Sequence, residues 1–231
     1  METDIKPLSR LLVEYDLRHA RMAGSPRQPA VHQATALAAL SKWYQGSKSP
    51  KGGILVLPTG GGKTFTATHF TCHEALSSGA KVLWLAHTHH LLEQAFEAFE
   101  KGVGLIHEPR STLRVRVVSG QGGEHFPVHT VKESDDVVIG SLATVCRAYE
   151  EQHCSLMAFL ESSNGNLLVI FDEAHHAPAR TYRELLRNLR RRYPNMTSLG
   201  LTATPTHSDE RKRSWLLELF PQGILHQVTA N

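Results

Sequence analysis

The chain has no hydrophobic run long enough to cross a membrane, and it has few cysteines. A membrane-spanning helix needs about 20 consecutive apolar residues, and no stretch of the 231 residues approaches that length. The first residues, from Met1 to Asp4, lack the basic and apolar segments of a secretion signal. The three cysteines, Cys72, Cys146 and Cys154, form no C-x-x-C pair. We therefore expect a protein of the reducing cytoplasm with no membrane partner.

The sequence also lacks a strong net charge, internal repeats and low-complexity segments. The formal charge is +3, which permits contact with nucleic acid but does not by itself argue for it. The hydrophobic fraction of 41% is sufficient for a packed core in one large α/β domain or two small ones. Fifteen histidines are present, but they do not show the paired short spacing of zinc ligands. For His89 and His90 we expect a surface turn at a helix start rather than a metal site.

Strand-like and helix-like segments alternate along the chain, with Gly, Pro and Ser between them. Strands are predicted at residues 54–57, 81–86, 113–119, 136–140, 167–171, 198–202 and 223–228. Helices are predicted at residues 31–44, 65–76, 91–101, 142–160 (with a break near Gln152), 178–192 and 209–219. This alternation predicts an α/β fold with a mostly parallel sheet and helices on both faces. A leading amphipathic helix is predicted between Leu8 and Leu17, before the stop at Gly24.

Residues 52–64 combine a short apolar strand, a glycine-rich turn and the start of a helix. Glycines allow backbone N–H groups to close around phosphate oxygens, and the following helix adds the positive end of its dipole. In such a loop, Lys63 would reach the β- and γ-phosphates and Thr64 would bind Mg²⁺. A plain glycine turn is the alternative, because Leu57 stands where the motif G-x-x-x-x-G-K-[ST] has its first glycine.

Two further polar sites follow predicted strands. The apolar run at 167–171 ends in Asp172 and Glu173, at the sheet edge where open parallel sheets bind ligands. There Asp172 would hold Mg²⁺ and Glu173 could polarise an attacking water, although an acidic helix cap would look the same. The strand at 198–202 ends in Thr202 and, two residues later, Thr204, for which a capped turn is the alternative.

The order and spacing of these segments favour one site. Asp172 follows Lys63 by 109 residues and Thr202 follows Asp172 by 30. Residues 58–64, 172–175 and 202–204 resemble motifs I, II (in its DEAH form) and III of the superfamily 2 helicases and translocases. The continuation after His175 is similar to the branch that contains restriction-enzyme translocating subunits and UvrB-like helicases. Weaker similarities to motifs Ia and Ib lie at residues 82–95 and 138–144.

The resemblance covers roughly residues 27–228 and implies the fold of a RecA-like P-loop NTPase domain with ATP and Mg²⁺ as cofactors. On this basis we assign residues 27–231 to the ATP-binding lobe 1 of a helicase and residues 1–26 to a helical N-terminal extension. The residues that the resemblance places at the nucleotide are Gln33 (adenine), Thr59, Gly60, Gly61, Gly62, Lys63 and Thr64 (phosphates), Thr64 and Asp172 (Mg²⁺), and Glu173 (catalytic base, with Lys63). It assigns coupling to His175, Thr202 and Thr204, and contact with the nucleic-acid backbone to His87, Thr88, Ser141 and Thr144.

The resemblance also implies a partner. Superfamily 2 helicases have a second RecA-like lobe, which supplies motifs IV to VI and an arginine finger, and nothing after Pro205 resembles those motifs. We therefore expect the second lobe to be absent from this chain. Loss of such an arginine costs about 10³–10⁵ in turnover, so we expect this chain alone to bind ATP and hydrolyse it slowly. The nucleic acid is expected to be DNA in preference to RNA.

Three alternatives remain at this stage. A single lobe could act as a non-catalytic ATP switch or a partner-binding module, although Lys63, Asp172 and Glu173 together exceed what a scaffold needs. A small-molecule kinase would share the phosphate loop but would not explain the other two motifs. The arginines between Arg180 and Arg192 could bind nucleic acid or form a solvated face countered by Glu184.

Overall fold

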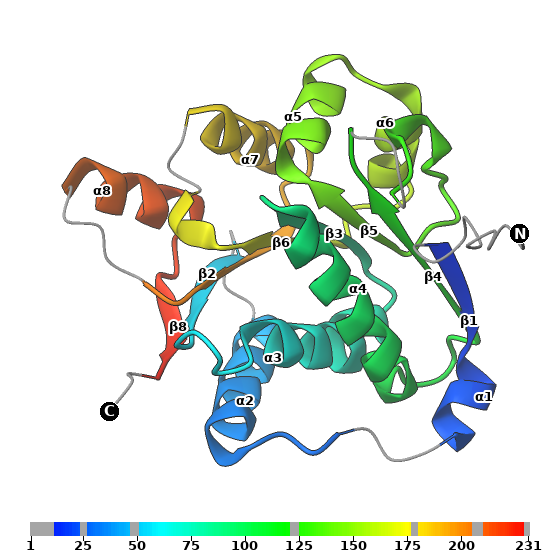
Figure 1. The fold of residues 1–231 in the computed structure, drawn as a ribbon. Helices are drawn as coiled ribbons and strands as arrows, with labels where there is room; N and C mark the ends of the chain where they lie inside the picture. Colours follow the sequence, from blue (N-terminus) through cyan, green and yellow to red (C-terminus); the bar gives the residue numbers. More distant parts are fainter. Residues whose placement is uncertain are drawn as a thin grey trace, which may run out of the picture.

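The central sheet has eight strands in the order β1-β4-β5-β3-β6-β7-β2-β8 (Figure 1). The computed structural model describes residues 12–23, 27–46, 51–120, 125–176, 180–204 and 210–228. Its strands are β1 (Leu12–Asp16), β2 (Lys51–Val56), β3 (Lys81–Ala86), β4 (Thr112–Val118), β5 (Val137–Ser141), β6 (Leu167–Asp172), β7 (Thr197–Thr202) and β8 (Ile224–Gln227). Every pairing is parallel except that of β1 with β4. The predicted mostly parallel α/β sheet is therefore confirmed.

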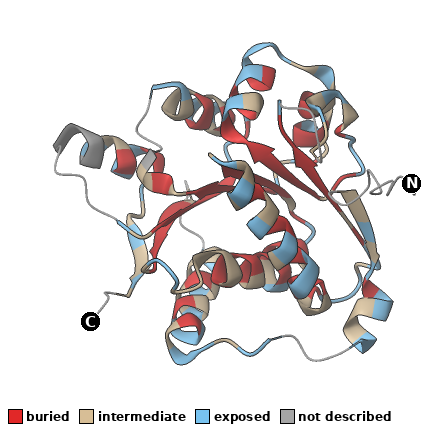
Figure 2. Cartoon of the chain, in the orientation of Figure 1, coloured by how far each residue is buried: buried red, intermediate tan, exposed pale blue. Residues whose placement is uncertain are grey.

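Helices cover both faces of the sheet, as predicted (Figure 1). One face carries α1 (Leu17–Met22), α2 (Val31–Gln45), α3 (Lys63–Phe70), continued by a π-helical turn at Thr71–Leu76, and α4 (His89–Gly102). The other carries α5 (Leu142–Glu150), α6 (Cys154–Glu161), α7 (Arg180–Arg192) and α8 (Glu210–Leu219). Neighbouring residues of one strand supply the two cores: Trp84 packs on the first face and Leu85 on the second. The strands between the edge strands β1 and β8 are accordingly the most buried part of the chain (Figure 2).

The predicted leading helix is wrong for residues 12–16. This segment is β1, which pairs antiparallel with β4 at the edge of the sheet, while Leu8 and Leu11 lie outside the described residues. Val13 and Tyr15, two residues apart, both pack on one core, as alternate residues of a strand do. Pairing with β4 therefore decides the structure of this segment, although its leucines have helical spacing. The helix begins only at Leu17, where the Asp16 carboxylate accepts the backbone N–H of Arg18 at 2.9 Å. The separate extension over residues 1–26 stays a prediction.

The predicted break near Gln152 is confirmed. Residue 152 has a left-handed backbone (φ +51°), and α5 and α6 end and begin on either side of it. The other predicted strands and helices agree with the structure within a few residues of their ends. None of the helices within the described ranges is long and apolar enough to span a bilayer.

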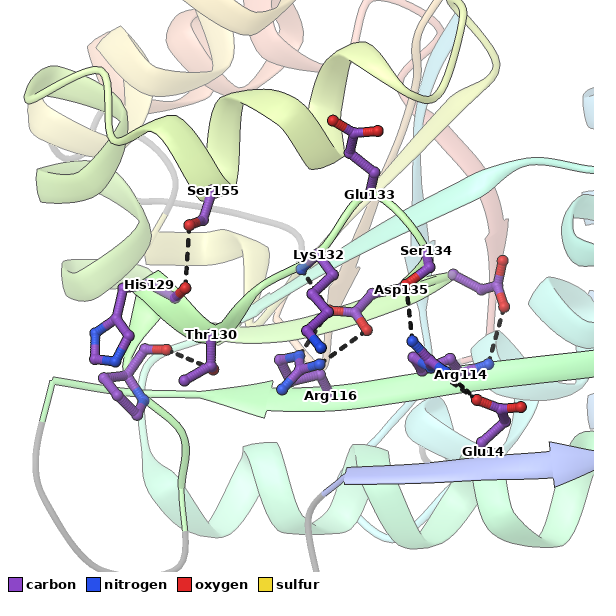
Figure 3. A network of polar contacts seen from close by, with 12 residues as sticks. Glu14, Arg114, Arg116, His129, Thr130, Lys132, Glu133, Ser134, Asp135 and Ser155 are labelled. Atoms are coloured by element: carbon purple, nitrogen blue, oxygen red, sulfur yellow. Dashed lines mark hydrogen bonds and ion pairs between the residues drawn. The ribbon is translucent and has the colours of Figure 1, made fainter.

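Charged side chains gather where β3 and β5 begin, and they are paired there (Figure 3). Arg116 on β4 is 3% exposed and donates two hydrogen bonds, of 2.6 and 3.1 Å, to the fully buried carboxylate of Asp135. That carboxylate also accepts the backbone N–H of Lys132 at 2.9 Å, and Arg114 pairs with Glu14 of β1. A buried bidentate pair with further hydrogen bonds is the arrangement that holds ions inside a protein.

Candidate nucleotide-binding site

The phosphate loop lies between β2 and α3. Leu57 is fully buried and donates its backbone N–H to Thr202 O at 3.2 Å, so it extends the strand, and the loop begins after it. Gly60 and Gly62 have φ of +76° and +80°, a backbone conformation that residues other than glycine rarely adopt. Gly62 caps α3 without any side-chain hydrogen bond to the first turn. The first N–H groups of α3 therefore face the loop without a side-chain partner, as an anion-binding helix start requires.

Two acidic residues end β6 opposite this loop. Asp172 is 1% exposed, and its Oδ1 accepts the N–H of Glu173 at 3.0 Å. Glu173 has φ +54°, a strained value for a residue with a side chain, and its Oε1 lies 3.6 Å from Lys63 Nζ. The sheet order explains this meeting, because β6, β7 and β2 are neighbours. Lys63 and Glu173, which are 110 residues apart in sequence, thus form an ion pair.

The buried carboxylate of Asp172 fits a divalent cation. Its Oδ2 is shielded from solvent and makes no hydrogen bond to any described residue. Burial, and secondarily the charge of Glu173, raise the pKa of Asp172 to about 6, against the opposing effects of the Glu173 N–H, of Lys63 and of the nearby Trp84 indole. An anionic oxygen without a donor, next to a second carboxylate, is stabilised by a cation. Mg²⁺ commonly binds through one or two protein ligands and substrate phosphates, so Asp172 and Thr64 suit it.

His175 connects the acidic pair to β7. Its Nδ1 lies 3.2 Å from Thr202 Oγ1 and 3.2 Å from Glu173 Oε2. Thr202, fully buried, donates its hydroxyl to Thr204 O and accepts the Thr204 N–H, both at 3.1 Å. The three segments that the sequence singled out therefore form one continuous set of contacts from the phosphate loop to the end of β7.

Comparison with known proteins identifies the family. Residues 27–207 match the family model described as "Type III restriction enzyme, res subunit". The chain belongs to this family. It is 28% identical over 192 residues to "Putative helicase 22" of Sulfolobus islandicus filamentous virus (isolate Iceland/Hveragerdi), a match that covers 82% of this chain and 30% of the viral protein.

Solved structures show the same fold. The helicase domain of Pyrococcus furiosus Hef superposes with a TM-score of 0.59 at 23% identity, covering 85% of this chain and 37% of that one. S. cerevisiae Dbp5 bound to RNA and ADP BeF3 superposes with a TM-score of 0.59 at 16% identity, covering 94% of this chain and 50% of Dbp5. Together with the family match, this fold makes the chain a RecA-like lobe of the superfamily 2 helicases and translocases. It spans half or less of the length of these proteins.

Within this lobe, the remaining residues predicted at the nucleotide lie in or beside the loop. Thr59 and Gly60 are exposed at its tip. Gln33, by contrast, is 5% exposed on α2; its Oε1 accepts the Ala30 N–H at 3.0 Å and its Nε2 donates to Gly61 O at 3.2 Å. Sequence reasoning missed His32, whose Nε2 lies 3.1 Å from the same Gly61 oxygen. The adenine contact of Gln33 stays a prediction.

The four residues predicted at the nucleic-acid backbone lie where β3 and β5 end. The Thr88 hydroxyl caps α4 through the Leu91 N–H at 3.4 Å. Ser141 caps α5 in the same way, and its hydroxyl donates to Thr144 Oγ1 at 2.7 Å. Thr144 lines an open hollow of about 490 Å³. These hydroxyls anchor helix starts, so any nucleic-acid contact would use the same groups or the backbone around them.

His87 has a different surrounding, which the sequence did not reveal. Its ring packs edge-on against Tyr182 of α7 at 5.1 Å and against Phe171 of β6 at 6.1 Å. Phe171 directly precedes Asp172 in sequence, so His87 adjoins the strand that carries the acidic pair. The predicted backbone contact of His87 stays a prediction.

Each arginine of α7 contacts another group of the protein, which favours the countered face over a free basic surface. Arg187 donates two bonds of 2.6 Å to Glu218 of α8, and the Arg183 guanidinium lies 4.0 Å from the Trp215 ring centroid. Arg190 binds Leu219 O and Ser198, Arg192 pairs with Glu161, Arg180 with Glu184, and Arg191 with Asn188. Arg183, Arg187, Arg190 and Arg192 thus join α7 to other elements, whereas the partners of Arg180 and Arg191 lie on α7 itself. Among the described residues, no three His, Cys, Asp or Glu side chains are placed to hold a metal ion together.

Proposed function

We propose that the chain is the ATP-binding lobe of a helicase or translocase that couples ATP hydrolysis to movement along DNA. The observation that carries this proposal is the joining of the phosphate loop, the acidic pair and the end of β7 through contacts of 3.2–3.6 Å. A scaffold domain needs no buried carboxylate oxygen that accepts no hydrogen bond, such as Asp172 Oδ2, and holding one is unfavourable for folding. Family membership points to the same chemistry.

The roles follow from position. The glycine loop and the start of α3 would bind the phosphates, and Lys63 would leave Glu173 for the β- and γ-phosphates. Asp172 and Thr64 would hold Mg²⁺, which when bound neutralises charge that develops on the phosphates. Glu173, released from Lys63, would orient the attacking water and accept its proton. His175 would sense this change, because it contacts both Glu173 and Thr202.

The nucleic acid and the second lobe belong to the same proposal. We infer DNA from the restriction-enzyme family; the similar Dbp5 structure was solved with RNA. Because relatives are two to three times longer than this chain, a second RecA-like lobe in the same protein or in a partner chain would supply the arginine finger. Without it, turnover would be lower by about 10³–10⁵.

The competing function is a non-catalytic module that uses ATP as a switch. The two proposals differ in what a second lobe does. A motor lobe gains hydrolysis when joined to its second lobe and nucleic acid, whereas a switch module binds ATP and gains none.

The test is ATP turnover with single-stranded DNA, duplex DNA and RNA, for this chain alone and for the two-lobe protein, beside Lys63→Ala. Lys42→Ala is the matched control, because Lys42 is an exposed lysine of α2. We expect slow turnover by the chain alone, DNA-stimulated turnover by the two-lobe protein, and loss of both only in Lys63→Ala. Fast nucleic-acid-stimulated turnover by the 231 residues alone would contradict the need for a second lobe. Nucleotide binding without turnover in the two-lobe protein would favour the switch.

A further inference from the structure

Gln33 is built into the phosphate loop. Its amide is used at both ends, since the oxygen accepts the Ala30 N–H and the nitrogen donates to Gly61 O. The first of these bonds is the return half of a capping box, which fixes the start of α2. The side chain is 5% exposed. A group held in this way cannot turn to a ligand without giving up a bond inside the protein.

The loop is packed directly against this amide. A Cβ built on Gly62 would lie 2.3 Å from Gln33 Nε2, so the glycine is required there by space as well as by its φ of +80°. His32 reinforces the contact from the preceding residue, with its Nε2 at 3.1 Å from Gly61 O. Gln33 and His32 therefore hold the carbonyl of Gly61, in the middle of the loop, from the side of α2.

A cavity of about 450 Å³ lies between α3 and α4 and reaches Thr64 at the start of α3, within the range of roughly 300–1,000 Å³ of small-molecule sites. Thr64 lines it next to the phosphate site, and Phe65 and His69 of α3 continue its wall. The Arg27 guanidinium lies over the Phe65 ring at 5.1 Å, and the Phe65 and His69 rings lie 5.9 Å apart. Arg27, Phe65 and His69 thus form a guanidinium and aromatic wall beside Thr64, in which the two rings meet edge-on.

The polar groups of this cavity are poorly suited to read the edge of a base. Gln94, Glu97 and Lys101 line it from α4 and are exposed, so water can satisfy them whichever base is present. His69 also lines the cavity, but its Nδ1 is shielded from solvent, so a base in the cavity would not reach that atom without a movement of the ring. Strong discrimination needs a buried polar group that the wrong ligand leaves unpaired. Stacking on aromatic and guanidinium faces does not provide it, because every base has a π-face.

We propose that this site accepts nucleoside triphosphates with little regard to the base. Gln33 holds the phosphate loop instead of reading adenine, and the base stacks beside Phe65 and Arg27. The proposal rests on the proposed nucleotide-binding function and specifies its substrate class. It assigns the affinity to the triphosphate and Mg²⁺, which all four nucleotides share.

The test is competition of ATP, GTP, CTP, UTP and inorganic tripolyphosphate, each with Mg²⁺, against a fluorescent nucleotide bound to the 231-residue chain. We expect the four nucleotides to bind within about threefold of one another, less than the effect of one net hydrogen bond. Gln33→Ala should weaken all five ligands by the same factor, about tenfold. Phe65→Ala should weaken the four nucleotides about tenfold and leave tripolyphosphate unchanged.

Tripolyphosphate separates the two roles of Gln33, because it has no base. If ATP binds at least ten times more tightly than the others, and Gln33→Ala removes that preference without weakening tripolyphosphate, the proposal is overturned. Equal binding of all ligands by wild type and Gln33→Ala would also overturn it. His32→Ala guards against misfolding of the Gln33 variant: it removes the milder contact with the same Gly61 oxygen and should weaken all five ligands equally but less. Absence of any binding, or binding indifferent to Lys63→Ala, would instead contradict the proposed function itself.

Discussion

Buried carboxylates at the two ends of the parallel strands differ in how many hydrogen bonds they accept. Where β3 and β5 begin, the Asp135 carboxylate receives two hydrogen bonds from Arg116 and one from a backbone N–H. Where β6 ends, the Asp172 carboxylate is equally buried but receives one backbone N–H, and its second oxygen makes no hydrogen bond with any described residue. Asp172 is followed by Glu173 in a left-handed conformation, whereas no such residue adjoins Asp135.

The difference separates a structural site from a functional one. The full set of hydrogen bonds to Asp135 holds the start of β5 in place. The unsatisfied oxygen, the strained Glu173 and the uncapped start of α3 all reduce stability, and they lie within one group of contacts. Violations of local rules that cluster in this way are expected at functional sites.

The largest effect on stability is expected at Asp135, whose carboxylate is fully hydrogen-bonded where β5 begins. Asp135→Ala would leave the Arg116 guanidinium buried without its partner, so the free energy of unfolding should fall by about 3–5 kcal/mol. Glu14→Ala is the matched control in the same network, because it removes the half-exposed partner of Arg114 and should cost about 0–1 kcal/mol. Urea unfolding of both variants measures the difference. Equal losses in the two variants would remove the basis for calling Asp135 a buried structural ion.

At Asp172, where β6 ends, we expect a substitution to reduce turnover but not stability. Asp172→Asn removes a buried charge without changing the shape of the side chain, so the free energy of unfolding should stay within about 0.5 kcal/mol of wild type or rise. In the two-lobe protein, turnover should fall by at least about 100-fold, as when a group that stabilises transition-state charge is lost. If Asp172→Asn lowered the free energy of unfolding by several kcal/mol, Asp172 would stabilise the fold as Asp135 does.

A smaller effect should appear with pH in the metal-free protein. The pKa of Asp172 is about 6 in the fold, against an ordinary 3.8, so the folded state binds this proton more tightly than the unfolded state. The free energy of unfolding should therefore decrease as pH rises from about 4 to about 6 and then level off. The difference between wild type and Asp172→Asn isolates this contribution from other carboxylates. Parallel pH profiles of the two proteins would contradict the raised pKa.

The smallest effect is expected on α7. Arg187 and Glu218 form a pair whose side chains are both 44% exposed, so a double-mutant cycle with alanine should give a coupling of about 0.2–1 kcal/mol. Arg187→Ala should also leave DNA affinity of the two-lobe protein nearly unchanged. A marked loss of DNA affinity that is strongest at low salt would assign α7 to the nucleic-acid surface instead.

Local patterns predicted much of the fold and the members of the candidate site. Lys63, Asp172 and Thr202 each follow an apolar strand, and parallel strands bring their ends to one edge, so sequence order was sufficient to group them. What could not be predicted depends on contacts between distant segments. β1 is a strand because it pairs with the free edge of β4. Arg187 is paired because α8 lies beside it. The Gln33 amide is hydrogen-bonded to Gly61, which lies 28 residues further on.

The most direct measurement is calorimetric titration of the 231-residue chain with ATP, with and without Mg²⁺, for wild type, Lys63→Ala, Asp172→Asn and the surface control Lys42→Ala. We expect Mg²⁺ to strengthen ATP binding in wild type and Lys42→Ala but not in Asp172→Asn. In Lys63→Ala, ATP binding should be lost. ATP binding of equal strength in all four proteins, indifferent to Mg²⁺, would contradict the claim that the phosphate loop and the acidic pair form one site.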